Sequence, residues 1–206
     1  AAGGQAVGTA AAIAVRYGCT PREIGTHMDE LQQELLKDDC YLPGFANHDE
    51  RDKARSARVT ASGYTEGNEP EKVINGVART VGEESNCWEA EIGPEGAAIT
   101  LDFGKHTLLS RIQLTFDPNL TREIMPSLTK NVRDRQIKGM PDELVKDYQI
   151  KLFLDGKEVF SRRIEENYQR LNRINLENET ECDKLTVTVF KAYGISRARI
   201  FEIRAS

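Results

Sequence analysis

The sequence predicts a mainly β protein, a jelly-roll β-sandwich that follows a short α-helical segment. Stretches after residue 57 alternate apolar and polar side chains, which is typical of strands with one buried face. Seven or eight such stretches follow one another with turns rather than helices between them. This favours packed antiparallel sheets over a parallel sheet. Residues 1–43 instead repeat apolar residues at the spacing of helices.

The segment 1–43 is expected to form a small helical hairpin. An alanine-rich stretch predicts a first helix over residues 4–17, and the Thr-Pro-Arg-Glu sequence at 20–23 is a good start for a second. A third helix is expected next, with Thr26 as its cap. Met28, Leu31 and Leu35 recur at helical spacing and give this helix one apolar face. A hairpin of this size buries too little surface to be stable alone. Because the chain also lacks an initiator methionine, we expect it to come from a longer parent enzyme.

Residues 57–206 are expected to form the sandwich. Ile99 and Leu101 fall on one face of a predicted strand over 98–103, and Asp155-Gly156 predicts a tight hairpin turn. The other strands are expected at 111–116, 148–154, 157–164, 171–176, 185–190 and 198–203.

Two further segments stand apart from these elements. Residues 44–56 are charged with little to bury, which predicts a linker or a short exposed helix. Residues 120–145 form an insertion of a length that is uncommon and often functional. Its basic residues could attract anions, form an ordinary solvated face with nearby acids, or dock on the parent enzyme. They are Arg122, Lys130, Arg133, Arg135 and Lys138.

The composition excludes several function classes. The net charge of -5 argues against broad nucleic-acid binding, and no apolar run is long enough to span a bilayer. The four cysteines are far apart, so we expect free, mostly buried thiols, with a Cys19–Cys40 disulfide as the alternative. The three histidines lie in no catalytic motif, and we expect no independent active site.

The start of the first helix has the chemistry of an anion site. Unpaired N–H groups attract phosphate, and glycines let a ligand approach the backbone. A closely packed structural helix would show the same composition. Residues 4–12, with the motifs at 17–18, 20–23 and 31–36, resemble the C-terminal end of FAD-dependent oxidoreductases of the glutathione-reductase-like family. That resemblance implies FAD contacts in the intact parent by Gly4, Gln5, Ala6 and Gly8. The GxGxxG fingerprint is absent from this chain, so we expect no FAD binding by this chain alone.

A second resemblance covers residues 57–206. Motifs at 61–62, 72–76, 99–104, 111–112, 154–156 and 198–203, with Thr80 and Trp88 between them, follow the order of the discoidin, or coagulation-factor C-type, domain. This is a galactose-binding-like jelly roll. Further motifs at 119–120, 140–141, 144–148, 167–170 and 193–194 resemble the sandwich fused behind such flavoenzymes in bacteria.

The discoidin resemblance implies two ligands. Relatives hold calcium near the 72–80 loop, so Asn75, Thr80 and Glu202 are the candidate ligands, although Asn75 replaces the usual carboxylate. Relatives also bind sugars through exposed aromatic rings beside polar groups. Trp88 falls at a position that is usually buried in the family, so it is not a candidate for sugar contact. The candidates are Tyr64, Tyr168 and Tyr193.

These resemblances together predict the C-terminal accessory part of an FAD-dependent oxidoreductase, inactive by itself, whose sandwich serves domain docking or ligand binding. FAD would carry the redox chemistry of the parent. One alternative is a lectin-like carbohydrate-binding module. Another is a structural cap that covers apolar surface of the enzyme.

Overall fold

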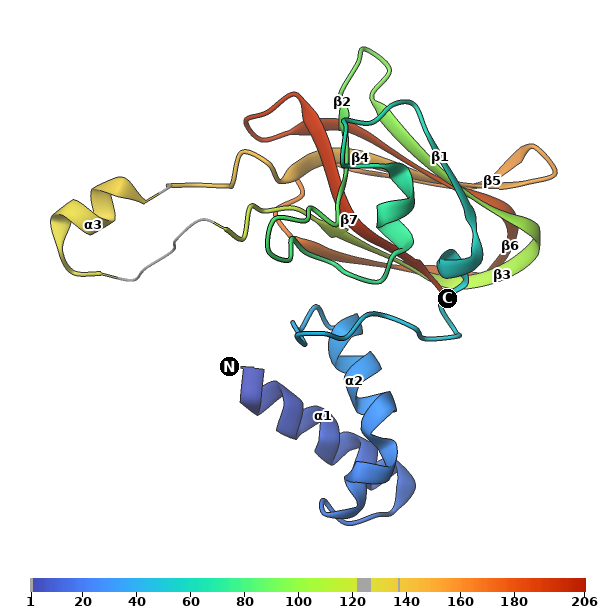
Figure 1. Cartoon of the computed structure of the whole chain (residues 1–206). Coiled ribbons are helices and arrows are strands. Elements are labelled where there is room, and N and C mark those ends of the chain that lie inside the picture. Colours follow the sequence, from blue (N-terminus) through green and yellow to red (C-terminus); the bar gives the residue numbers. More distant parts are fainter. Residues whose placement is uncertain (1, 122–126, 137) are drawn as a thin grey trace. The chain divides into compact units, whose positions relative to one another are not determined.

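The computed structural model describes residues 2–121, 127–136 and 138–206, so Arg122 of the insertion lies outside the described residues (Figure 1). The chain divides into two compact units, residues 1–50 and residues 51–206. Among the described residues, no helix combines the length and the apolar character that crossing a membrane requires.

The first unit is helical, as the sequence predicts. It contains α1 (Ala2–Tyr17), a 3-10 helix (Glu23–His27) and α2 (Met28–Lys37). Its small core consists of Ile13, Leu31 and Leu35, against which Ala6, Ala10, Ile24, Cys40 and Leu42 pack. Glu23, the first residue of the 3-10 helix, accepts hydrogen bonds from the N–H and the hydroxyl of Thr20 at 2.8 and 2.9 Å, which is one half of the expected capping box.

Two details of the helical prediction are wrong. Thr26 does not cap α2, because its hydroxyl donates to the carbonyl oxygen of Glu23 at 2.8 Å and the 3-10 helix runs directly into α2. Met28 does not share the buried face of Leu31 and Leu35, and it is 42% exposed. Met28 lies at the first position of α2, before the face that meets α1.

The described residues of the second unit contain seven strands: β1 (Arg58–Ala61), β2 (Trp88–Glu91), β3 (Ala97–Phe116), β4 (Val145–Leu154), β5 (Lys157–Ile164), β6 (Leu171–Ala192) and β7 (Arg197–Ala205). All pairings are antiparallel, in the order β2-β7-β3-β6-β4-β5, with β1 also paired to β3. Each expected strand lies within one of these elements. The four-residue strands β1 and β2 were not predicted, because so few residues show no clear alternation.

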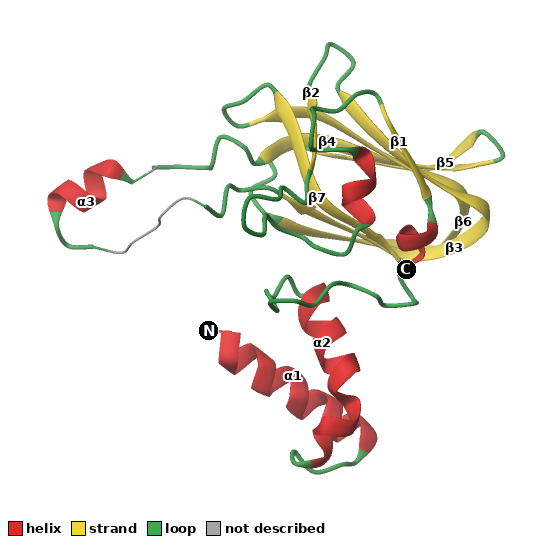
Figure 2. Cartoon of the chain, viewed as in Figure 1, coloured by secondary structure: helices red, strands yellow, loops and turns green. Residues whose placement is uncertain are grey.

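The long strands β3 and β6 connect the two layers of the sandwich. The first half of β3 pairs with β1 and its second half with β7, while β6 accompanies it through both halves. Register shifts after Asp102 and Leu109 mark where β3 bends from one layer to the other. The sheet therefore folds over itself, as Figure 2 shows for the strands.

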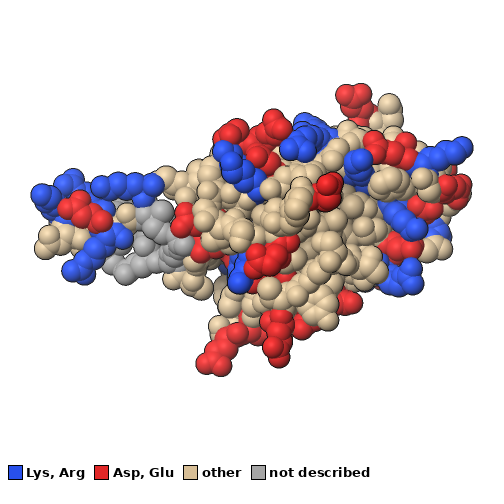
Figure 3. Space-filling model, turned by 90° about the horizontal axis from the view of Figure 1, so that it is seen from above, with Lys and Arg blue, Asp and Glu red and all other residues tan. Residues whose placement is uncertain are grey.

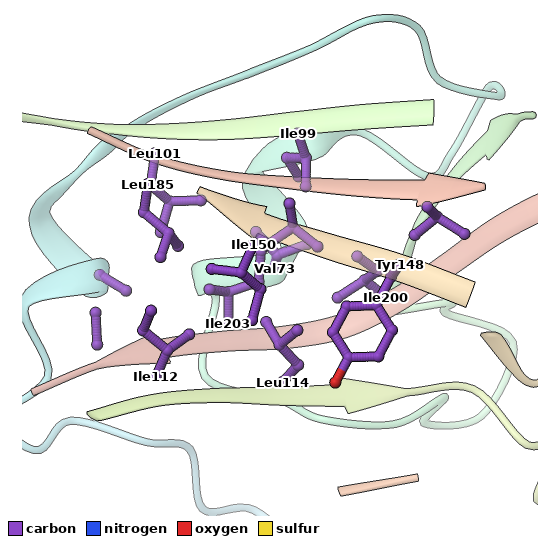
Figure 4. Close-up of a cluster of buried hydrophobic side chains, with 14 of the residues drawn as sticks. Val73, Ile99, Leu101, Ile112, Leu114, Tyr148, Ile150, Leu185, Ile200 and Ile203 are labelled. Carbon is purple, nitrogen blue, oxygen red and sulfur yellow. The ribbon is translucent and has the colours of Figure 1, made fainter. Parts of the chain in front are cut away.

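The core lies between the layers (Figure 4). Ile99 and Leu101 from the first half of β3 face Ile112 and Leu114 from its second half, and all four are fully buried. Burial of each such side chain contributes roughly 1.5–3 kcal/mol. Tyr148 of β4 is also buried, and its hydroxyl donates to Oδ1 of Asn172 at 3.1 Å, so its polar group is satisfied.

The segment 44–56 spans the boundary between the two units, and most of its residues are exposed, while Asn47, Asp52 and Ala54 are buried. In the first unit, the side chain of Gln33 accepts from the N–H of His48 at 2.8 Å and donates to the carbonyl of Ala46. In the second unit, Oδ1 of Asp52 accepts from the N–H groups of Ala54 and Ala205 at 3.1 and 3.0 Å. These hydrogen bonds between side chains and backbone attach each half of the segment to its own unit. They could not be predicted from the charged composition of the segment.

The insertion leaves the sandwich between β3 and β4. It carries one short helix, α3 (Lys130–Arg135), which projects away from the strands (Figure 1). Asn119, at the start of the insertion, donates from Nδ2 to Oε1 of Glu143, near its end, at 2.8 Å. This hydrogen bond connects the two ends of the insertion where it leaves the sandwich.

Candidate functional site

Several loops leave the sandwich at the same end. Strand pairing places Ala97 beside Val189, Val145 beside Ala192, and Phe116 beside Ile200. Three loops begin or end next to these paired residues, namely 62–69, 117–144 and 193–196. We call this end of the sandwich the loop end. In sandwich proteins, functional side chains are carried on loops that a rigid scaffold positions.

Trp88 fixes the loop 62–69 from below. Its ring is fully buried, as the sequence predicts, and its Nε1 donates to the carbonyl oxygen of Gly63 at 3.0 Å. The N–H of Thr65 donates to the carbonyl of Glu89 at 2.8 Å. Tyr64 lies between these two bonded residues and is 59% exposed. The loop therefore presents an aromatic ring to solvent on an ordered backbone.

Glu89 is the centre of a polar network beside this loop. Its carboxylate is buried, and Oε1 accepts from the hydroxyl of Thr65 and from Nη1 of Arg197, both at 3.1 Å. Its Oε2 accepts from Nη1 of Arg199. A buried carboxylate is costly unless it is paired and hydrogen-bonded, and two guanidinium groups and a hydroxyl meet that need here.

The network continues outward from each arginine. Nε of Arg197 lies 2.7 Å from Oε1 of Glu91, and the Ser196 hydroxyl donates to the other oxygen of that carboxylate at 3.1 Å. These two hydrogen bonds lower the pKa of Glu91. Nε of Arg199 lies 2.7 Å from Oδ2 of Asp117. We call Tyr64, Thr65, Glu89, Glu91 and Arg197 the Arg197 cluster.

The Arg197 cluster has hydrogen-bonding groups that a small polar ligand could use. The side chain of Arg197 is 49% exposed, and its bonds to residues that the structure describes come from Nε and Nη1. An arginine has five N–H donors, so further donors remain for a ligand. The carboxylates of Glu89 and Glu91 hold the guanidinium in one orientation, and the exposed Tyr64 is next in sequence to Thr65, whose hydroxyl bonds the same Glu89 carboxylate. Sequence reasoning missed Arg197, Glu89 and Glu91, because their meeting depends on strand pairing between β2 and β7.

The other candidate tyrosines lie elsewhere at the loop end. Tyr168 is 69% exposed, next to Asn167, whose buried amide donates to the carbonyl of Val145 at 2.7 Å. Tyr193 is half-buried, and Nζ of Lys146 lies 5.4 Å from its ring centroid. An ammonium group therefore already lies over the ring of Tyr193.

The candidate calcium ligands are engaged in other contacts. Asn75 accepts at Oδ1 from the N–H of Val77 and donates from Nδ2 to Asn86, both at 2.8 Å. Glu202 is buried, and its Oε2 accepts from Nε of Arg204 at 2.8 Å. Thr80 is half-buried in its loop. Within the described ranges, no group of three or more His, Cys, Asp or Glu residues could hold a metal ion.

Cationic side chains bind the carbonyl groups of this region. Arg170 donates to the carbonyls of Phe116, at 2.9 Å, and of Ala78. Nζ of Lys72 donates to the carbonyls of Gly67 and Ser85, both at 2.7 Å. Calcium needs six to eight oxygens, including carboxylates, and Glu202 already pairs with a guanidinium. The residues present therefore do not fit a calcium ion.

The residues expected to contact FAD lie on α1. Gly4, Gln5 and Gly8 are exposed, while Ala6 packs against the small helical core. A Cβ added at Gly4 or Gly8 would meet nothing within 4 Å. Packing among the described residues of this chain therefore does not require glycine at either position.

The cysteines show no catalytic setting. All four are described, and none forms a disulfide. Burial raises the pKa of Cys87 to about 12 and that of Cys182 to about 11. Both thiols stay protonated at neutral pH and are poor nucleophiles.

Comparison with known proteins supports the fold. A family of domains of unknown function, DUF7402, matches residues 52–143, and no curated protein matches the chain. A fucose-binding module of Streptococcus pneumoniae shares 12% identity, with a TM-score of 0.56, over 75% of this chain and 96% of that chain.

Two further solved structures cover nearly the same part. The lectin domain of lectinolysin in complex with Lewis B antigen has 12% identity and a TM-score of 0.57, over 76% of this chain and 96% of that chain. The family 32 CBM of C. perfringens NanJ in complex with galactose has 15% identity and a TM-score of 0.51, over 74% and 95%. At such identities these similarities establish the fold alone. The sandwich of this chain is a galactose-binding-like jelly roll, as the sequence predicts.

Proposed function

We propose that the sandwich is a carbohydrate-binding module whose site is the Arg197 cluster at the loop end. The observation that carries the proposal is that Tyr64 is exposed on a loop that Trp88 and Glu89 fix, next in sequence to Thr65, whose hydroxyl bonds the same carboxylate as the half-exposed Arg197. The solved structures of the same fold, which are described as binding fucose, Lewis B antigen and galactose, support a sugar as the ligand.

The chemistry of the cluster suits a sugar ring. A sugar has an apolar C–H face and hydroxyl groups in fixed directions. An exposed tyrosine ring packs against such a face, while charged donors and acceptors bind hydroxyls more strongly than neutral groups do. Arg197 would donate to ring hydroxyls, and Glu91, held by Arg197 and Ser196, would accept from them. Both partners are ordered before the ligand arrives, which reduces the entropy cost of binding.

A glycan array probed with the full chain tests the proposal. We expect specific hits that disappear with Tyr64→Ala and persist with Tyr168→Ala, which removes a more exposed tyrosine from a different loop. An array without hits contradicts carbohydrate binding. Hits that depend on Tyr168 and not on Tyr64 would keep the function and move the site.

A second proposal concerns the helical unit, for which we infer a parent with an FAD-dependent oxidoreductase domain. Two observations support this parent. Gly4 and Gly8 are exposed and no packing within the described chain requires them, and residues 4–36 resemble that family. In the parent, Gly4, Gln5, Ala6 and Gly8 would lie against FAD, which would supply the redox chemistry. The sandwich would then direct the parent enzyme to a glycan or dock on the oxidoreductase domain.

The absorption spectrum of the intact parent tests this second proposal. A flavin band at about 450 nm in the parent, absent from this chain alone, is the expected result. A purified parent without bound flavin would contradict it, and the carbohydrate-binding proposal would be unaffected.

A further inference from the structure

The insertion ends in a strongly basic tip. We call the described residues 127–136 and 138, with α3 among them, the basic arm. Its sequence has four cations, Lys130, Arg133, Arg135 and Lys138, and one carboxylate, Asp134, so its net charge is +3. The whole chain carries -5, so the remainder carries -8. Figure 3 shows blue side chains gathered on the projecting arm.

The cations of the basic arm differ from many on the sandwich. All four are exposed, and none forms an ion pair with a residue that the structure describes. On the sandwich, by contrast, Lys146 pairs with Glu166 and Lys151 with Glu158, each at 2.7 Å. Unpaired exposed cations repel one another, and a polyanion bound to them would relieve that repulsion.

The base of the arm is joined to the loop end. Asp117, three residues before the insertion, bonds Arg199, and Arg199 bonds the central carboxylate of the Arg197 cluster. Near the end of the insertion, the carbonyl of Asp142 accepts from the N–H of Gly194 at 2.9 Å. A ligand held at the Arg197 cluster therefore lies at the end of the sandwich from which the arm projects.

We propose that the basic arm selects acidic polysaccharides, by binding carboxylate or sulfate groups of a glycan chain whose neutral hydroxyls occupy the Arg197 cluster. This inference rests on the proposed function and adds its substrate class. Arginine binds carboxylate and sulfate geometry well, and clustered cations attract a chain that repeats its charge. Only one large apolar side chain of the described arm, Leu128, is fully exposed, which gives a lipid surface little to bury.

The test compares one glycan backbone with and without its charge. Polygalacturonate and its methyl-esterified form have the same backbone, and the full chain would be titrated with each by affinity electrophoresis. The arm variant is Lys130→Gln/Arg133→Gln/Arg135→Gln/Lys138→Gln. The matched control is Lys105→Gln/Lys157→Gln/Arg162→Gln/Lys191→Gln, which removes four exposed cations with no ion pair among the described residues. Heparin and alginate extend the test to other acidic chains.

We expect wild type and control to bind an acidic chain more tightly than the esterified one. The arm variant should lose about tenfold or more in affinity, and the preference should fade between about 0.05 M and 0.5 M salt. An arm variant that binds acidic chains as wild type does overturns the inference. Equal or tighter binding to inorganic polyphosphate or to phosphatidylglycerol vesicles overturns the polysaccharide as partner.

The outcomes separate this inference from the proposed function. If the glycan array gives neutral hits that need Tyr64, while no acidic polysaccharide binds, the module stands and the role of the arm is wrong. If Tyr64→Ala abolishes binding to acidic chains and the arm variant weakens it, both stand. If neither neutral nor acidic glycans bind, both fail.

Discussion

Arg204 donates from Nε to Oε2 of Glu202 at 2.8 Å, and both residues are buried on β7. The two side chains lie two residues apart, so they point to the same face of the strand. Glu202 is the carboxylate that the discoidin resemblance assigns to calcium. In this chain the guanidinium of Arg204 neutralises it.

The first prediction is that calcium does not stabilise the protein. Asn75 provides no charge, and Arg204, Arg170 and Lys72 already bind the carboxylate or the carbonyls of the region. Thermal unfolding followed by fluorescence should give the same midpoint in EDTA and in millimolar calcium. A calcium-dependent rise of several degrees would show that an ion displaces these cations.

The second prediction concerns the ion pair itself. Arg204→Met removes a charged partner from a buried carboxylate, which should lower the free energy of unfolding by about 3 kcal/mol. Chemical denaturation measures the loss. The double variant Glu202→Gln/Arg204→Met removes both charges and should recover at least half of the loss. If the double variant is as unstable as the single one, lost packing rather than the uncompensated charge explains the effect.

The third prediction is a pH effect at the opposite end of the sandwich. The hydrogen bond and the charge of Asp155 raise the pKa of His106 above 6.5, with Glu181 and Asp183 adding to the effect. A raised pKa means that protonated His106 stabilises the folded state. The contribution is complete below about pH 6.5 and is lost as the pH rises through the folded-state pKa. His106→Gln should therefore lower the midpoint of thermal unfolding at pH 5.5 and leave it unchanged at pH 9. The same deficit at both pH values would rule out this ion pair as its cause.

The fourth prediction separates the cysteines by reactivity. Burial keeps Cys87 and Cys182 protonated, whereas Cys19 and Cys40 are partly exposed. Iodoacetamide at pH 7.5, followed by peptide mass spectrometry, should label Cys19 and Cys40 first and Cys87 and Cys182 only after denaturation. Labelling of Cys87 in the native protein at the rate of Cys19 would contradict the burial described for it.

The sequence predicted the parts of the fold that depend on local pattern. Alternation located the strands around Ile99 and Ile150, and the Asp155-Gly156 pair located the β4–β5 turn, where both residues have positive φ. Helical spacing and a capping box located the first unit. The motif order identified the jelly roll, since the resemblance covered a full domain length.

The candidate site could not be predicted because its contacts are long-range. Glu89 meets Arg197 and Arg199 through the pairing of β2 with β7, more than a hundred residues away in sequence. No local pattern marks the four residues of β2 as a strand. Lys72 and Arg170, which bind carbonyl groups near the candidate calcium ligands, were missed for the same reason, whereas Arg204 was not beyond reach of the sequence. Its position two residues after Glu202 on a predicted strand was a usable signal.

The affinity of Tyr64 variants for a glycan identified on the array tests the central claim most directly. Isothermal titration of wild type, Tyr64→Phe and Tyr64→Ala isolates the aromatic ring at an exposed position, where loss of folding is not expected. The account predicts that Tyr64→Phe stays close to wild type and that Tyr64→Ala binds at least about tenfold more weakly. Equal affinities for all three proteins would contradict a carbohydrate site at the Arg197 cluster.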